Sequence, residues 1–189
     1  MSPSRGTIAV GAHLRRALVA AAASAVLAGC VSLQRGAEPG GGETLAGRLS
    51  IRVDEEMAPA RSLTAGFELR GNPRAGRLDL ATPLGSVLAQ ARWSPTSVVL
   101  ATPRGETEYT DLDALTRAAL GESLPLAALF DWLHGRPWPG APSRPAPAGN
   151  GFIQLGWAVD LTRYDEALVS ARRDDPLPVT TVRIKLDRP

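Results

Sequence analysis

The sequence of 189 residues contains only one cysteine, Cys30, and two histidines, His13 and His134. A single thiol excludes a disulfide framework within the chain, and this set of ligands is too small for a Cys₂His₂-type zinc site. The sequence also lacks the Gly-x-Ser-x-Gly, P-loop and Gly-x-Gly-x-x-Gly motifs of hydrolases, nucleotide-hydrolysing enzymes and dinucleotide enzymes. What remains is an apolar content of 44%, which is typical of a folded domain.

Acidic residues are absent from the first 29 positions, which carry Arg5, Arg15 and Arg16 followed by the apolar run 17–27. This is the layout of a secretory signal, and the run is much shorter than the roughly 20 residues that a membrane-spanning helix needs. The run ends in Leu27-Ala28-Gly29-Cys30, which resembles the lipobox of bacterial lipoproteins. We therefore predict a signal peptide over 1–29 and a diacylglycerol on the thiol of Cys30. The alternative is an ordinary secretory signal with an incidental cysteine.

Net charge depends on this leader. The full sequence carries a formal charge of +2, which becomes −1 when residues 1–29 and their three arginines are removed. The remaining basic residues are scattered arginines with the single lysine Lys185, so we expect no nucleic-acid partner.

The predicted mature chain begins with a glycine-rich stretch, residues 30–43, that favours a flexible lipidated tether. Val31 stands where an aspartate retains lipoproteins in the inner membrane of enterobacteria, which favours the outer membrane for this chain. From Thr44 onward apolar and polar residues alternate, as in Leu49, Ile51 and Val53, and this period of two predicts half-buried strands. We expect one domain over 44–189.

The strand pattern is interrupted once by a helical pair. Asp111 or Thr110 can cap a first helix that ends at Gly121, and Pro125 can open a second that ends at Gly135. Residues 136–151 hold five prolines and three glycines and predict an irregular loop. The expected fold is mainly β (α+β), with eight to eleven short antiparallel strands in a curved sheet covered by two short helices. Periodicity does not decide whether the enclosed apolar space is packed or open.

Candidate catalytic groups are few. His134 is the only histidine after the leader and stands at a helix end, where histidine commonly caps the helix. The carboxylates cluster beside turns, where solvated loop charge is the ordinary interpretation; they are Asp54, Glu55, Glu56, Asp174 and Asp175. We expect no enzymatic activity, no metal and no cofactor.

One turn places a large apolar residue at its tip, in Thr82-Pro83-Leu84-Gly85-Ser86. The turn alone favours inward folding of Leu84 onto the sheet. The chain, however, resembles the LolB family of outer-membrane receptors, which take lipoproteins from the periplasmic carrier LolA. The resemblance rests on Gly47-Arg48-Leu49, Ala65-Gly66-Phe67-Glu68-Leu69, Arg77 to Ser86, Tyr109-Thr110-Asp111, Leu124-Pro125-Leu126, Trp132-Leu133, Gly135-Arg136-Pro137, Gly156-Trp157 and Arg183-Ile184-Lys185-Leu186.

The resemblance implies an incomplete β-barrel of the LolA/LolB type, with a helical lid over a cavity for acyl chains. It also implies that the loop Pro83-Leu84-Gly85 enters the bilayer and that the chain inserts cargo lipoproteins into the outer membrane. A lipid-binding or lipid-sensing lipoprotein without insertase activity is the alternative. We expect a monomer whose cavity is lined by Leu49, Ile51, Phe67, Leu69, Leu78, Leu80, Trp93, Trp132, Trp157 and Val159.

Overall fold

Eleven antiparallel strands form one sheet in the computed structural model, which describes residues 43–147 and 149–187. The strands are β1 (Glu43–Asp54), β2 (Arg61–Gly71), β3 (Gly76–Ala81), β4 (Val87–Ser94), β5 (Ser97–Thr102), β6 (Gly105–Tyr109), β7 (Ser143–Pro145), β8 (Gly151–Gln154), β9 (Trp157–Asp160), β10 (Leu168–Arg173) and β11 (Val179–Leu186). Their spatial order is β6-β5-β4-β3-β2-β1-β11-β10-β9-β8-β7. The first and last strands in sequence are therefore neighbours, while β6 and β7 form the two edges of an open, incomplete barrel.

The predicted leader, Cys30 and most of the predicted tether lie outside the described residues. Glu43, the last residue assigned to that tether, is instead the first residue of β1 and pairs with Gly71 of β2. The predicted end of the tether is therefore one residue too late. The glycine-rich sequence before Glu43 gives no sign of the pairing with Gly71, which is distant in the chain.

Alternation of side chains determines which face of the sheet is covered. Leu49, Ile51 and Val53 of β1 are buried, while Arg48 and Arg52 between them are exposed. Successive side chains of a strand point to opposite faces, so one face of the sheet is apolar and the other charged. The predicted half-buried strands are confirmed.

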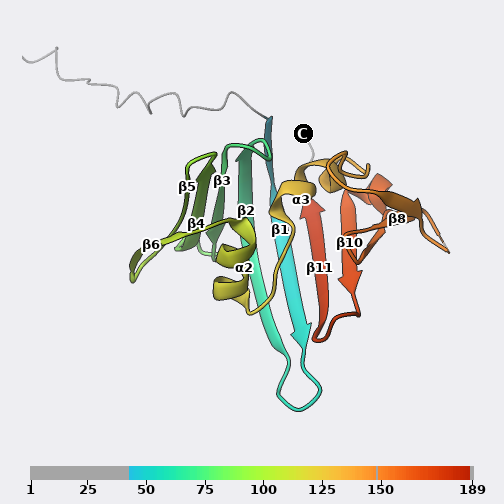
Figure 1. The fold of residues 1–189 in the computed structure, drawn as a ribbon, viewed down its shortest axis with the longest axis horizontal. Helices are drawn as coiled ribbons and strands as arrows, with labels where there is room; N and C mark the ends of the chain where they lie inside the picture. Colours follow the sequence, from blue (N-terminus) through green and yellow to red (C-terminus); the bar gives the residue numbers. More distant parts are fainter. Residues whose placement is uncertain (1–42, 148, 188–189) are drawn as a thin grey trace, which may run out of the picture. The chain divides into compact units, whose positions relative to one another are not determined.

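Two helices lie over the apolar face, α2 (Leu112–Leu120) and α3 (Leu126–Leu133) (Figure 1). Asp111 caps α2 by accepting a hydrogen bond from the backbone N–H of Ala114 at 2.7 Å, and Gly121 ends it with a φ of 80°. Both helices match their predicted bounds. They place an apolar cover over a sheet that would otherwise expose its inner face to water.

The proline-rich segment 136–151 is more regular than expected, because β7 lies within it and pairs with β8. Gln154, 1% exposed, connects this segment to α3: its Oε1 accepts from the indole N–H of Trp132 at 2.8 Å and from the backbone N–H of Trp138 at 2.9 Å. Its Nε2 donates to the carbonyl oxygens of Trp138 and Ala141. Proline is tolerated in β7 because it is an edge strand, and the partner that orders the segment is distant in sequence.

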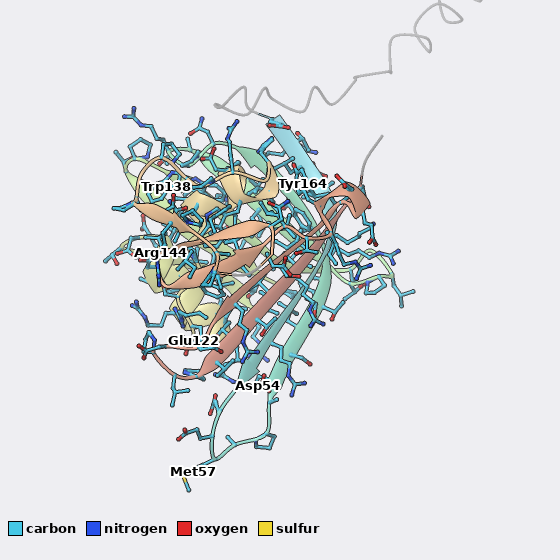
Figure 2. The ribbon with its side chains drawn as sticks, turned by 90° about the vertical axis from the view of Figure 1, so that its right-hand side faces the viewer. Asp54, Met57, Glu122, Trp138, Arg144 and Tyr164 are labelled. Carbon is cyan, nitrogen blue, oxygen red and sulfur yellow. The ribbon has the colours of Figure 1, made fainter. Side chains whose placement is uncertain are left out.

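The hairpin of β1 and β2 projects beyond the neighbouring strands, with Met57 at its tip (Figure 2). Thr102-to-Gly105 and Ala81-to-Val87 are the turns that close neighbouring hairpins at the same end of the sheet. This end therefore consists of loops, one of which extends well past the others.

Gly47 allows β1 and β11 to approach closely, and this contact gives a stability test. A Cβ added to Gly47 would lie 2.1 Å from the carbonyl oxygen of Lys185, whereas one added to Gly66 of β2 would meet nothing nearer than 3.8 Å. We expect Gly47→Ala to lower the free energy of unfolding by about 1–3 kcal/mol, as overpacking does. Gly66→Ala is the matched control and should be neutral or stabilising by up to about 1 kcal/mol. Equal urea midpoints for the two variants would contradict this account of the β1–β11 contact.

Candidate functional site: an apolar pocket beneath the helices

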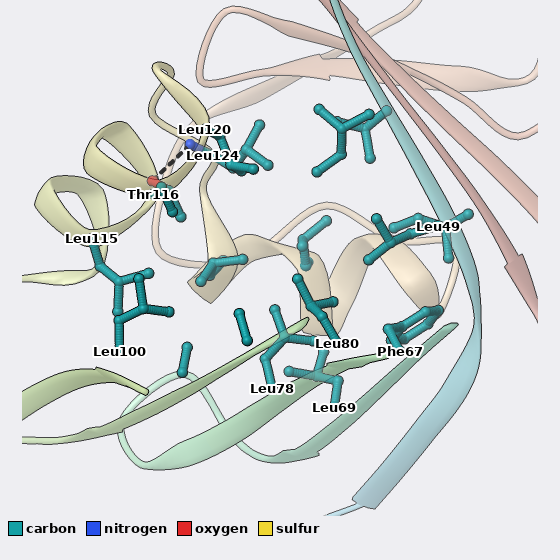
Figure 3. Close-up of a pocket in the computed structure, with 18 of the residues that line it drawn as sticks. Leu49, Phe67, Leu69, Leu78, Leu80, Leu100, Leu115, Thr116, Leu120 and Leu124 are labelled. Carbon is teal, nitrogen blue, oxygen red and sulfur yellow. Dashed lines mark hydrogen bonds between the residues drawn. The ribbon is translucent and has the colours of Figure 1, made fainter. Parts of the chain in front are cut away.

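A pocket lies between the helices and the inner face of strands β1 to β5 and β11 (Figure 3). The space between its lining side chains, including the part open to solvent, is about 740 Å³. All but one of its lining residues are apolar: Leu49, Ile51, Phe67, Leu69, Leu78, Leu80, Ala89, Ala91, Leu100, Leu115, Ala119, Leu120, Leu124, Leu126, Leu129, Leu133, Val182 and Ile184. Such a wall suits a ligand that is itself hydrocarbon.

Thr116 is the one polar residue of the lining, and its hydroxyl is already satisfied within the protein. It donates to the carbonyl oxygen of Asp113 at 3.2 Å and accepts from the backbone N–H of Leu124 at 3.0 Å. The second bond ties α2 to the segment that leads into α3. The hydroxyl therefore serves the geometry of the lid, and the pocket wall presents hydrocarbon to its interior.

Six of the ten predicted cavity residues line this pocket: Leu49, Ile51, Phe67, Leu69, Leu78 and Leu80. They come from β1, β2 and β3, whose alternation placed them on one face. The structure brings them together because these three strands are adjacent in the sheet.

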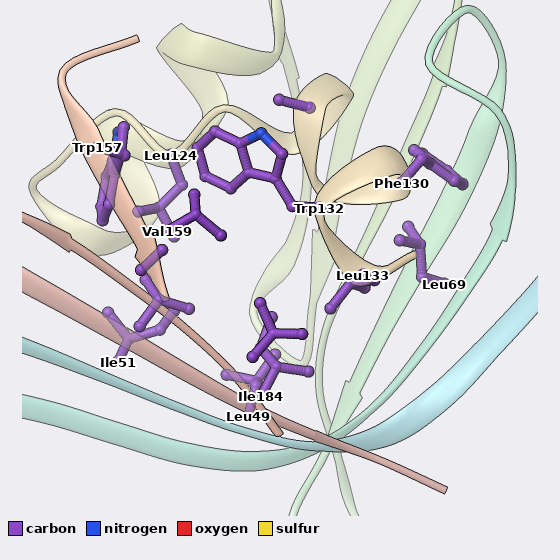
Figure 4. Close-up of a cluster of buried hydrophobic side chains, with 14 of the residues drawn as sticks. Leu49, Ile51, Leu69, Leu124, Phe130, Trp132, Leu133, Trp157, Val159 and Ile184 are labelled. Atoms are coloured by element: carbon purple, nitrogen blue, oxygen red, sulfur yellow. The ribbon is translucent and has the colours of Figure 1, made fainter. Parts of the chain in front are cut away.

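The structure places the other four, Trp93, Trp132, Trp157 and Val159, in the packed core instead. Trp132 contacts Phe152 and Trp157 with ring centroids 6.3 and 6.4 Å apart, as Figure 4 shows for the two tryptophans. Trp93 packs edge-on to Phe130 of α3 at 6.2 Å and donates its indole N–H to the carbonyl oxygen of Asn72. The alternation of side chains predicts which face of the sheet a residue lies on, but not what covers it. Around these four residues, bulky aromatic rings fill the space above the sheet.

Helix residues supply much of the lining that sequence reasoning left out, among them Leu115, Leu120 and Leu129, and β4, β5 and β11 supply the rest of the strand lining. The helical spacing of these leucines showed that each helix has an apolar face, but not which part of the sheet that face covers. The signal that could have identified them is the combination of two short amphipathic helices with a sheet too broad for them to cover.

Leu84 is 95% exposed, so the inward folding that the turn alone favoured does not occur. The loop is held by its own backbone: the N–H of Gly85 donates to the carbonyl oxygen of Thr82, and that of Ser86 donates to the Thr82 hydroxyl. Gly85 has a φ of 85°, and Pro83 restricts the residue before the tip. The loop therefore exposes a leucine to solvent on a backbone that is held by these two hydrogen bonds.

Three of the five clustered carboxylates are ion-paired, at the end of β1 or in the loops. Asp54 pairs with Arg52, Glu55 with Arg61, and Asp174 with Arg172, each at 2.7 Å. Within 43–147 and 149–187 no group of three or more His, Cys, Asp or Glu side chains could hold a metal ion. In the same residues no helix is long and apolar enough to cross a membrane.

Residues 44–188 match the family model described as "Outer membrane lipoprotein LolB". The chain belongs to the LolB family. Proteins named outer-membrane lipoprotein LolB share 32% identity in Bordetella petrii, over 97% of this chain and 98% of the relative, and 35% in Bordetella pertussis, over 87% and 88%. A third, from Cupriavidus pinatubonensis, is 32% identical over 92% of this chain and 87% of its own.

Membership of the LolB family confirms the resemblance drawn from the motifs and places the chain among outer-membrane lipoproteins. The open sheet with a helical lid likewise confirms the expected fold class.

His134 caps the C-terminal end of α3 and connects it to β1. Its Nδ1 lies 2.5 Å from the carbonyl oxygen of Phe130, and its Nε2 lies 2.7 Å from the carboxylate of Glu43. Partial burial lowers the pKa of His134, as does nearby Arg136, but the bonds to Phe130 and Glu43 outweigh both, and the pKa is raised above its ordinary value. These two contacts hold the C-terminal end of α3 against the first strand.

This linkage predicts a pH dependence of stability. Because the folded-state pKa of His134 is raised, its contribution is complete below the unfolded value of about 6.5 and is lost as pH rises through the folded value. We expect the free energy of unfolding to fall over this interval in the native chain and to fall less in His134→Gln, which cannot titrate. Urea unfolding across the neutral range would test this, with Glu43→Gln as the partner variant. Parallel curves for the native chain and His134→Gln would contradict it.

Proposed function

We propose that this LolB-family chain accepts lipoproteins from the periplasmic carrier LolA and inserts them into the outer membrane by non-covalent transfer of their acyl chains. It would act as a monomer, anchored through lipid on Cys30, and not as an enzyme. The observation that carries the proposal is the pocket beneath α2 and α3, whose wall is hydrocarbon except for the internally bonded Thr116. The pocket is the binding site that we assign to the acyl chains.

Transfer through this pocket requires a favourable free energy at each step. Burying one methylene group contributes about 0.8 kcal/mol, so an acyl chain moves toward whichever site removes more of it from water. A wall of leucine, alanine and phenylalanine offers burial but no directional bond that would have to break on release. The bilayer interior is more favourable still, and it is the natural final acceptor.

Release into the membrane is assigned to the loop Pro83-Leu84-Gly85. A leucine held almost fully in solvent at a turn has no role in packing the domain. It can enter the acyl region at the point where cargo leaves the protein. The pocket and the loop are joined through β3, since Leu78 and Leu80 line the pocket and the loop follows directly after Ala81.

A two-step transfer assay separates loading of the pocket from release to the membrane. We expect Leu84→Glu to leave carrier-to-receptor transfer intact and to slow receptor-to-vesicle transfer by roughly tenfold or more, because burial of a leucine contributes about 1.5–3 kcal/mol. Ala89→Phe, which fills the pocket from β4, should impair the first step. Ala101→Phe is its control on β5, next to the lining residue Leu100 and on the opposite face.

Two results would count against the proposal. Unimpaired vesicle insertion by Leu84→Glu would remove the role of the loop and favour a lipid-binding or lipid-sensing lipoprotein. Normal loading by Ala89→Phe would remove the pocket as the acyl-chain site. His134→Ala should transfer cargo normally, because the histidine is assigned to stability alone.

A further inference from the structure

Large exposed apolar side chains are concentrated at one end of the sheet. The described residues contain five, Met57, Leu84, Val87, Leu155 and Leu177, which we call the apolar rim. They lie in the β1–β2, β3–β4, β8–β9 and β10–β11 connections or at the adjoining start of β4. The antiparallel registers place all four connections at the same end of the strands.

The opposite end is different. Its connections include residues 72–75, 95–96 and 161–167, and the described part of the chain has no exposed large apolar side chain in any of them. Single exposed leucines are common on protein surfaces, but confinement of all of them to one end is not explained by chance exposure. The asymmetry indicates that one end meets an apolar environment.

Two tips of the rim are flanked directly by proline. Leu84 lies between Pro83 and Gly85, and Leu177 lies between Pro176 and Pro178. Proline fixes its own φ, so these segments have little backbone freedom left to lose when the leucines become buried against a partner.

The backbone conformation of Leu155 indicates that an exposed leucine is kept at this position at a cost in stability. It occupies a two-residue hairpin turn with φ of 53°, followed by Gly156 at 79°. Turns of this type favour asparagine or glycine at the first position, because a bulky side chain is strained at positive φ. A Cβ placed on Gly156 would lie 3.8 Å from the carbonyl oxygen of Asp175, so this turn and the loop of Leu177 are neighbours.

Charge at the rim argues against an anionic surface as the partner. The connections at this end carry Glu55, Glu56, Asp174, Asp175 and one arginine, Arg104, while the strand-end Arg61 and Arg172 pair with Glu55 and Asp174. Attraction to acidic lipid headgroups needs a basic cluster, which these loops lack. The apolar tips, and not the charges, would hold this end to its partner.

We propose that the whole apolar rim, and not the Leu84 loop alone, is the surface by which the domain rests on the phospholipid bilayer. This inference rests on the proposed function, since it extends the membrane contact assigned there to Leu84. Several shallow apolar contacts would fix the orientation of the domain, with the strand ends toward the membrane.

The anchor is compatible with this orientation. Twelve residues lie between Cys30 and Glu43, and the thirteen Cα–Cα steps span at most about 43–47 Å. Strand β1, with 12 residues, runs from Glu43 to the rim end over about 37 Å. A lipid on Cys30 and the rim can therefore reach the same bilayer.

Depth-dependent fluorescence quenching tests the proposal. In the full-length lipidated chain Cys30 carries no free thiol, so Met57→Cys, Leu84→Cys and Leu177→Cys each offer one site for an environment-sensitive fluorophore. Thr96→Cys, in the exposed β4–β5 turn at the opposite end, is the control. The probe is a zwitterionic vesicle of phosphatidylethanolamine and phosphatidylcholine containing lipids spin-labelled on their acyl chains.

We expect quenching at positions 57 and 177 comparable to that at 84, none at 96, and no loss of quenching when salt is raised. Quenching at 84 alone would overturn the rim while leaving the proposed function intact. Equal quenching at 96, loss of quenching in salt, or shielding of positions 57 and 177 by the carrier instead of by vesicles would also overturn it. Rim quenching together with normal cargo insertion by Leu84→Glu would instead retain the rim and remove the proposed release step.

Discussion

The structure depends on one constraint, which is that a broad sheet with a single apolar face must be covered. Eleven antiparallel strands joined through the β1–β11 pair form that face, and only two short helices lie over it. At 1.5 Å per residue, helices of nine and eight residues are each about 12–14 Å long. Where the tryptophan rings fill the space between the helices and the sheet, the interior is packed. Where mainly aliphatic side chains line that space, a pocket remains.

Two buried polar side chains hold the cover in place at the border between packed core and pocket. Gln154 of β8 ties α3 to the sheet through one hydrogen bond and the segment after α3 through three more. Arg173 of β10 pairs with Glu122, donates to the carbonyl oxygen of Ser123 and lies 5.1 Å from the centroid of the Trp157 ring. Arg173 thereby fixes the linker between the helices beside the pocket. Removal of either polar side chain would leave its partly buried partners without these hydrogen bonds.

Much of this architecture could be predicted from local pattern. Alternation identified β1 and β2, and Asp111 and Gly121 fixed the ends of α2, because caps and period two act within a few residues. Strand β10 was not predicted, since its third inward position is Arg173, whose burial depends on Glu122, 51 positions earlier in the chain. The tryptophans were assigned to the cavity for a related reason: their depth depends on what lies opposite them, and Gln154 and Phe130 are remote in sequence.

The proposed site also explains why an apolar pocket persists in a folded domain. Unfilled apolar space lowers stability, and a ligand that fills it recovers the lost contacts. The most direct measurement is photocrosslinking of a cargo lipoprotein whose acyl chains carry a diazirine, followed by mapping of the adducts on this protein. The account predicts adducts on the pocket wall, at residues such as Leu69, Leu120 and Leu129. Adducts confined to the charged outer face of the sheet, with none in the pocket, would contradict it.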